Sequence, residues 1–143
     1  MIRTIRQKKL QGRWFRQFLV IVMYYFIDYL STIYHCKSPY DEWNLIARYL
    51  MISFNIPLGM TIFFLGISVM WYLIILPISR ITENTRSRHW RNLFEYINIV
   101  VFASIAGWDF GYGATSWFWS APLFIRILSG SILYLIIDFL WIK

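Results

Sequence analysis

The stretch "FLVIVMYYFIDYLSTIYH" (residues 18–35) decides the fold class of this chain. It is long and almost entirely apolar, and a helix of about 20 such residues crosses the hydrocarbon core of a bilayer. With its neighbours it forms the first of four apolar runs, which lie near residues 14–34, 49–78, 93–107 and 122–142. We therefore predict an all-α fold, a multi-pass transmembrane four-helix bundle that forms one domain over residues 14–143.

The composition agrees with a membrane protein. Of the 143 residues, 59% are hydrophobic and only 15% are charged, whereas globular domains carry about 25% charged residues. So few charges cannot cover a surface that faces water. No small-x-small cleavage site follows the first run, so we expect that run to be a retained span and not a signal peptide.

Basic residues gather on one predicted side of the membrane. Eleven of the 14 Lys and Arg precede or begin the first span, separate the second from the third, or end the chain: Arg3, Arg6, Lys8, Lys9, Arg13, Arg16, Arg80, Arg86, Arg88, Arg91 and Lys143. Cytoplasmic loops carry this excess of Lys and Arg. We therefore expect a protein of the cell membrane with both termini in the cytoplasm. Its basic arm at residues 1–13 should meet anionic lipid headgroups and not nucleic acid.

The tryptophans support the same topology. Seven of the eight lie at predicted span ends, which is typical of the aromatic belts at the two membrane surfaces. These seven are Trp14, Trp90 and Trp141 at inner ends, and Trp43, Trp108, Trp117 and Trp119 at outer ends.

The second run is too long for one straight span. From Leu45 to Ile78 it would measure about 51 Å as a helix, against a hydrocarbon core of about 30 Å. Pro57 lies inside it and removes a backbone hydrogen bond. We expect the helix to be kinked or broken within one turn of Pro57.

Polar side chains interrupt the first span near its outer end. Asp28, Thr32 and His35 share one helix face, because they are spaced by four and seven residues. Arg126 enters the fourth span at a similar depth, and Asn55 could join the group. An ionisable residue in a span usually has a partner. We expect an Asp28–Arg126 pair that fixes the register of the helices.

Two alternatives for this group remain open. Carboxylate and imidazole suit transition metals, so Asp28, His35 and Glu42 form a possible metal site, although their spacing matches no known motif. Asp28 could instead relay protons or ions. Otherwise we expect structural lipids and no cofactor.

Other predictions concern the inner side and helix packing. Glu95 and Asp138 lie near the cytoplasmic edge, with Arg80 and Arg91 as expected partners. Small residues let helices approach closely in lipid, and we expect four of them to lie against other helices: Gly59, Gly66, Ala103 and Gly107.

The segment "DYLSTIYHCKSPYDEWNLIAR" resembles a family of small, uncharacterised four-helix membrane proteins of archaea and bacteria. The resemblance covers about 21 residues with an Asp-x3-Thr, Glu-x-Asn and Arg pattern, which falls on Asp28, Thr32, Glu42, Asn44 and Arg48. The family often has Pro after the Asn, where this chain has Leu45. The resemblance implies the same topology and no activity.

Short loops leave no room for a soluble catalytic domain. We therefore expect a non-catalytic accessory subunit that assembles with other integral membrane subunits, for example in an oxidoreductase complex such as a copper monooxygenase or a terminal oxidase. The comparison with those complexes rests on the general type of subunit and not on matching residues. The alternatives are a small oligomeric transporter or channel with an Asp28–Arg126 path, and an intramembrane metal-dependent enzyme.

The topology is testable by thiol labelling. In a Cys36→Ser background, a cysteine placed at Ser87 should be protected from a membrane-impermeant reagent in intact cells, because residues 80–92 are predicted to be cytoplasmic. Cysteines within residues 36–47 or 108–120 should be labelled. Labelling of the Ser87→Cys protein from outside would contradict the predicted orientation.

Overall fold

The computed structural model describes residues 9–142, and within them the chain is helical, with no strand. Most of the predicted basic arm, at residues 1–8, and Lys143 lie outside the described residues. Five α-helices are present: α1 (Gly12–His35), α2 (Leu45–Phe54), α3 (Ile56–Asn84), α4 (Arg88–Asp109) and α5 (Leu123–Ile137). All but α2 belong to helical stretches long and apolar enough to cross a membrane. The predicted all-α class, with four helices long and apolar enough to cross a membrane, is confirmed for the described residues.

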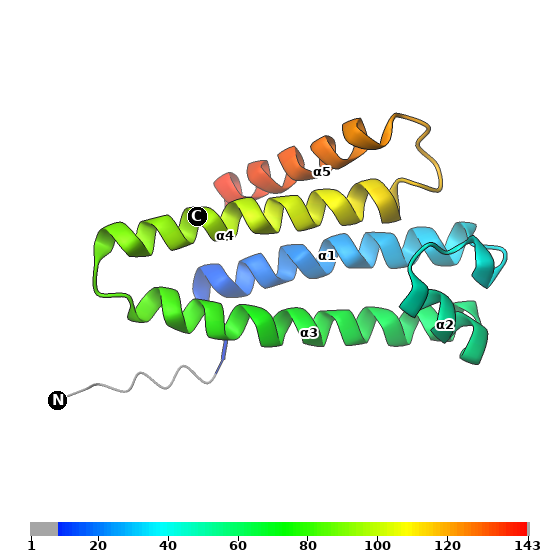
Figure 1. The fold of residues 1–143 in the computed structure, drawn as a ribbon, viewed down its shortest axis with the longest axis horizontal. Coiled ribbons are helices and arrows are strands. Elements are labelled where there is room, and N and C mark those ends of the chain that lie inside the picture. Colours follow the sequence, from blue (N-terminus) through cyan, green and yellow to red (C-terminus); the bar gives the residue numbers. More distant parts are fainter. Residues whose placement is uncertain (1–8, 143) are drawn as a thin grey trace.

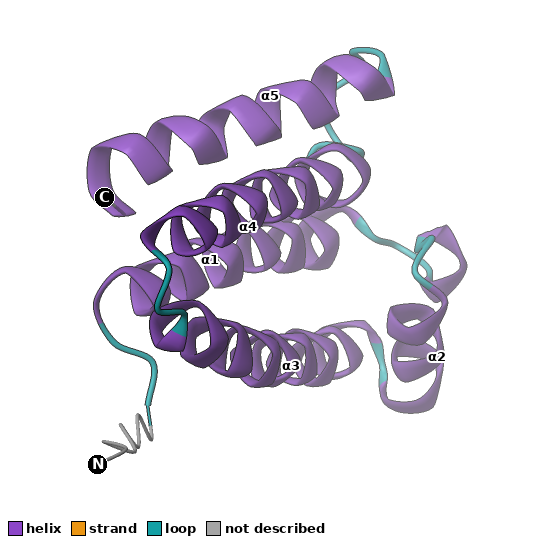
Figure 2. Cartoon of the chain, turned by 60° about the vertical axis from the view of Figure 1, so that its left-hand side comes forward, coloured by secondary structure: helices purple, strands orange, loops and turns teal. Residues whose placement is uncertain are grey.

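The four long helices run alternately up and down (Figure 1). In both views α1 lies between α3 and α4, and α5 packs on α4 (Figure 2). Helix α1 therefore begins at the end of the bundle where α5 finishes, and Arg16 Nη2 donates to the carbonyl oxygen of Ile142 at 2.8 Å. We call this the terminal end, and the opposite end, with residues 36–44 and 115–122, the loop end.

The second apolar run is divided at Asn55. Helix α2 finishes at Phe54, Asn55 adopts a left-handed φ of 108°, and α3 begins at Ile56, one residue before Pro57. The Asn55 side chain caps α3 by accepting from the Leu58 N–H at 3.0 Å. Pro57 lies in the first turn of α3, where no helical partner for its N–H is needed. The divided chain lets α2 fold back beside α3 (Figure 2).

The third span, Arg88–Ala114, extends beyond its predicted bounds of 93–107, whereas the fourth, Leu123–Ile142, agrees closely with the predicted 122–142. Helix α4 continues beyond residue 107 into a π-helical turn, η2 (Phe110–Ala114), and α5 continues through a second one, η3 (Asp138–Ile142). Residues 108–114 are therefore helical. They form the first part of the stretch 108–120, which was predicted to face outward. This extension carries Asp109 on a helix and not in a loop.

Glycines set how closely the helices approach. A Cβ added at Gly59 would lie 2.5 Å from the backbone of Leu50 in α2, and one at Gly107 would meet Ser131 Oγ and, at 2.6 Å, the Ile127 carbonyl of α5. Ala103 is also buried. Gly66, by contrast, is exposed and has no described residue within 4 Å of an added Cβ, so its expected packing, within this chain or on a partner, stays a prediction.

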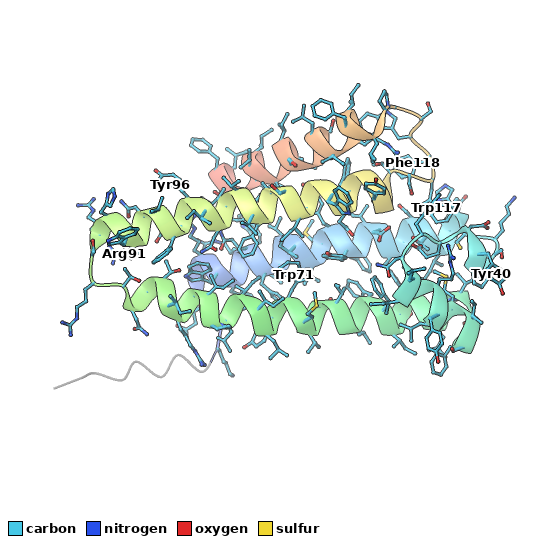
Figure 3. The ribbon with its side chains drawn as sticks, in the orientation of Figure 1. Tyr40, Trp71, Arg91, Tyr96, Trp117 and Phe118 are labelled. Atoms are coloured by element: carbon cyan, nitrogen blue, oxygen red, sulfur yellow. The ribbon has the colours of Figure 1, made fainter. Side chains whose placement is uncertain are left out.

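The core is apolar and aromatic, and it is centred on α1. Trp71 of α3 is buried and packs edge-on against Phe102 of α4, with ring centroids 6.3 Å apart. Tyr24 of α1 donates its hydroxyl to the Gly130 carbonyl of α5 at 2.8 Å. In Figure 3 Trp71 lies within the bundle, whereas Tyr96 and Phe118 lie at its surface, where both are exposed. An apolar surface of this kind suits contact with lipid.

Alanine substitutions at two glycines should separate packing from helix propensity. Alanine normally stabilises a helix relative to glycine by about 1 kcal/mol, so Gly66→Ala should be neutral or stabilising. Gly107→Ala should instead destabilise by about 1–3 kcal/mol, because its methyl group overlaps the α5 backbone. Thermal unfolding of the purified protein in detergent measures both. Equal midpoints for the two variants would contradict the α4–α5 packing.

Candidate functional site: an acidic cavity at the loop end

A cavity of about 420 Å³ opens among α1, α3, α4 and the 36–44 segment. Polar residues and aromatic rings both line it: Tyr25, Asp28, Glu42, Trp43, Asn44, Phe63, Ile67, Trp108, Asp109, Tyr112 and Gly113. Three of these residues are carboxylates, and none of the described residues that line the cavity is a Lys, Arg or His. We call this site the acidic cavity.

The three carboxylates come from three parts of the chain. Asp28 projects from α1, Asp109 is the last residue of α4, and Glu42 lies in the segment between η1 (Pro39–Asp41) and α2. All three line the same cavity. The fold therefore concentrates negative charge where the chain is otherwise apolar.

Gly113 lets η2 approach α1 at this point. A Cβ added to Gly113 would lie 2.5 Å from both Cγ and Oδ1 of Asp28. Any side chain at this position would push against the carboxylate. The absence of a side chain at Gly113 therefore brings α4 and its Asp109 alongside Asp28.

The carboxylates receive few hydrogen bonds from the described residues. Thr32 Oγ1 donates to Asp28 Oδ1 at 3.4 Å, which is long for a hydroxyl donor. Asp109 Oδ2 is buried and has no hydrogen-bond partner within residues 9–142. Glu42 Oε1 accepts from the Asn44 N–H at 2.8 Å. The nearby cation, Arg48, donates its Nε to the backbone carbonyl of Glu42 at 2.8 Å.

Burial shifts the acidity of Glu42. It raises the pKa of this carboxyl above its ordinary value of 4.5, against opposing hydrogen bonds from the Asn44 and Trp43 backbone and the charge of Arg48. The ionised form is therefore less stable in the folded protein than in water. A bound cation would offset that cost.

The predicted Asp28–Arg126 ion pair is wrong. Within residues 9–142 Arg126 forms no ion pair, and its Nε is buried without a hydrogen-bond partner. The reason is the packing of η2, because Gly111 lies against Ile127 of α5 while Gly113 lies against Asp28 of α1. The η2 backbone thus occupies the space between the two helices.

His35 and Asn55, also predicted for this group, lie outside the cavity lining. His35 Nδ1 is 2.9 Å from the Ser31 carbonyl, and its ring lies beside Phe118. Asn55 caps α3. The predicted metal set of Asp28, His35 and Glu42 is therefore not assembled, and the described part of the chain holds no group of three His, Cys, Asp or Glu side chains placed to bind a metal.

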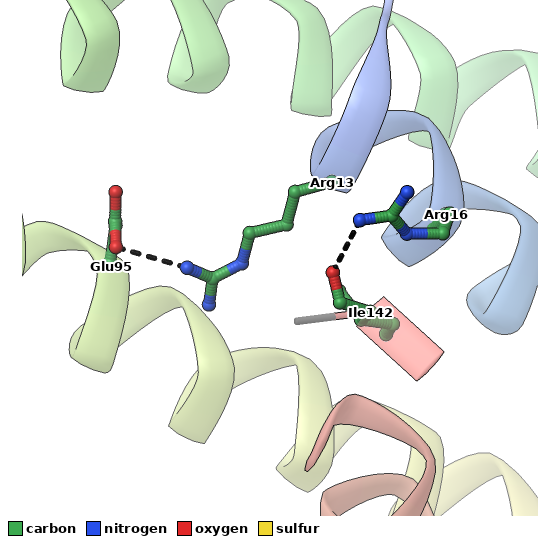
Figure 4. Close-up of polar contacts among 4 residues, drawn as sticks. All are labelled: Arg13, Arg16, Glu95 and Ile142. Carbon is green, nitrogen blue, oxygen red and sulfur yellow. Dashed lines mark hydrogen bonds and ion pairs between the residues drawn. The ribbon is translucent and has the colours of Figure 1, made fainter. Parts of the chain in front are cut away.

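The two carboxylates predicted near the cytoplasmic edge, Glu95 and Asp138, lie at the terminal end and differ from each other in their partners. Glu95 pairs with Arg13 of α1 at 2.9 Å, and not with Arg80 or Arg91 as predicted (Figure 4). Asp138 is 4% exposed, and its Oδ1 has no hydrogen-bond partner among residues 9–142. The Arg13–Glu95 pair is half-exposed and joins α1 to α4.

Sequence reasoning missed Asp109 and Gly113 as site residues. Both lie in "GWDFGYGATSWFWSAP", which looks like a loop because of its three glycines. A helical reading would have placed Gly107 and Gly111 on one face and Asp109 on the opposite one, since neighbouring residues are about 100° apart. That periodicity was the available signal.

Comparisons with known proteins identify no relative. No family model, no curated protein and no solved structure matches this chain. The function must therefore be inferred from the cavity and its surroundings.

The shifted Glu42 should make stability depend on pH. Because its folded-state pKa is raised, its favourable contribution is complete below pH 4.5 and is lost as pH rises through the folded-state value. The unfolding midpoint in detergent should thus rise as pH falls toward 4.5. Glu42→Gln should flatten that rise.

Asp41→Asn is the matched control, because Asp41 belongs to the same segment, is exposed and does not line the cavity. The asparagine keeps an oxygen for the Ser38 N–H that Asp41 caps. Its pH profile should be as steep as that of the unchanged protein. Identical profiles for the Glu42→Gln and unchanged proteins would contradict the burial of Glu42.

Proposed function

We propose that this chain is a small integral membrane protein that binds a cationic ligand in the acidic cavity. The observation that carries the proposal is that three carboxylates line one cavity, while residues 9–142 contribute no basic side chain to its lining. Carboxylates in a poorly hydrated place are stable when they are protonated or when a cation compensates them. The cavity is large enough to hold a ligand. A cationic ligand would compensate the charge of these carboxylates.

Among the functions expected from the sequence, this site favours the transporter alternative. In such a transporter the cation site would be formed by Asp28, Asp109 and Glu42. It would not be formed by the expected Asp28–Arg126 pair. Toward the terminal end the bundle is packed with buried residues such as Ile21, Trp71 and Phe102. The geometry therefore supports binding at the loop end more than open conduction through the chain.

The remaining expectations rest on the sequence and stay proposals. The charge asymmetry supports a location in the cell membrane with the loop end outward and the termini in the cytoplasm. In that orientation the cavity opens to the outside and the basic terminal end meets anionic headgroups. Association with other integral membrane subunits is supported by the many apolar side chains that the long helices expose, such as Leu65, Val69 and Leu73.

Cation binding should stabilise the folded protein. A ligand present at 100 times its Kd adds about 2.7 kcal/mol to the free energy of unfolding. We expect the unfolding midpoint in detergent to rise saturably with at least one of four chloride salts, those of sodium, potassium, ammonium and tetramethylammonium. The double variant Asp28→Asn/Asp109→Asn should lose that rise.

General effects of salt are separated by two controls. A general salt effect should shift the unfolding midpoints of the unchanged protein and of the double variant equally. The Asp41→Asn protein should keep the full response to the cation, because Asp41 lies outside the cavity lining. If every salt shifts the unchanged protein and the double variant equally, the proposal fails. If Asp41→Asn abolishes the response as well, the binding site is not the acidic cavity.

A further inference from the structure

Aromatic rings form much of the lining between the carboxylates. Tyr25 comes from α1, Phe63 from α3 and Trp43 from the 36–44 segment, while Trp108 and Tyr112 come from α4 and η2. Trp108 and Tyr112 stack, with ring centroids 4.4 Å apart and an angle of 29° between their planes. They form one continuous aromatic wall next to Asp109.

The carboxylates point to a missing positive charge. Asp109 lines the cavity, yet its Oδ2 is buried and unpartnered within residues 9–142. From the described part of the chain Asp28 receives only the long Thr32 hydrogen bond. Within residues 9–142 neither carboxylate is paired with a cation, although an ionised group in an apolar environment normally has a compensating partner.

The size and chemistry of the cavity select among cations. A volume of about 420 Å³ is within the range of small-molecule sites, which is about 300–1,000 Å³. An inorganic ion without its water would fill little of it, and the described His, Cys, Asp and Glu side chains form no metal-binding group. The aromatic wall offers nothing to a hydrated metal ion. It does suit an organic cation, because the faces of Trp and Tyr attract ammonium groups.

We infer that the acidic cavity binds an organic ammonium group, with carboxylates balancing its charge and aromatic rings contacting its carbon substituents. This inference rests on the proposed cation-binding function and specifies the class of ligand. A methylated ammonium group suits this cavity, because its positive charge would compensate the carboxylates and its methyl groups would lie against the aromatic wall. The same group occurs on soluble amines and on choline phospholipid headgroups.

The test compares soluble cations on the protein in detergent. Tetramethylammonium and choline chloride should raise the unfolding midpoint at concentrations at which sodium, potassium and magnesium chloride have little effect. The Asp28→Asn/Asp109→Asn variant should respond to none of them. Stabilisation by the inorganic salts alone would overturn the inference and leave the proposed function standing. No selective response to any cation would count against the proposed function itself.

Aromatic variants test the wall directly. Trp108 is 59% exposed, so Trp108→Leu should fold. It should bind tetramethylammonium about 2- to 30-fold more weakly, which corresponds to the usual range of one cation–π contact. Trp108→Phe restores an aromatic face and should recover part of the affinity. Unchanged affinity in Trp108→Leu would overturn the role of the wall.

A lipid arm separates the two sources of the ligand. The protein is reconstituted into vesicles of phosphatidylcholine or of phosphatidylglycerol, and its unfolding midpoint is compared with that of the double variant. A selective gain in phosphatidylcholine supports the inference and identifies a lipid headgroup as the source. A gain from soluble choline that is equal in both lipids supports it and identifies a free amine. If the unfolding midpoint rises in neither lipid and with no soluble amine, the inference that the cavity binds an ammonium group is overturned.

Discussion

The close approach of α4 and α5 is the constraint on which the loop end of this protein depends. Gly107 and Gly111 lie on one face of α4 and its extension, against Ile127 and Ser131, while Gly130 of α5 lies against Phe110. In lipid no hydrophobic effect drives helices together, so packing of small residues and hydrogen bonds takes its place. The Tyr24 hydroxyl, which reaches the Gly130 carbonyl at 2.8 Å, ties α1 to the same contact.

The α4–α5 contact determines which residues lie on the opposite face of α4. With Gly107 and Gly111 against α5, Asp109 and Gly113 are turned about half a revolution away, toward α1. Gly113 then lies against the Asp28 carboxylate, and Asp109 joins the same cavity. The π-helical geometry of η2 is consistent with a local site, since such turns occur often at functional positions. The acidic cavity is therefore a consequence of helix packing and not of one contiguous motif.

Individual residues show how far sequence reasoning reaches in this chain. Asp28 stood out because a carboxylate in an apolar helix must be compensated, and it does line the cavity. Arg126 was assigned to it on depth alone, and depth does not say which helix lies between two side chains. Glu95 was assigned to Arg80 or Arg91 for the same kind of reason, whereas the structure pairs it with Arg13. Asp109 was missed because a glycine-rich, aromatic segment looks like a loop until its packing partner is known.

The sequence by itself determined the membrane class, the four long helices and the presence of carboxylates among apolar residues. Those properties depend on hydrophobicity and on the helical period, which are local and additive along the chain. Only the tertiary structure decided which charges meet. That outcome depends on ångström-scale approach between segments far apart in sequence, at positions such as Gly107 and Gly113, where a single methyl group would separate the helices or displace Asp28.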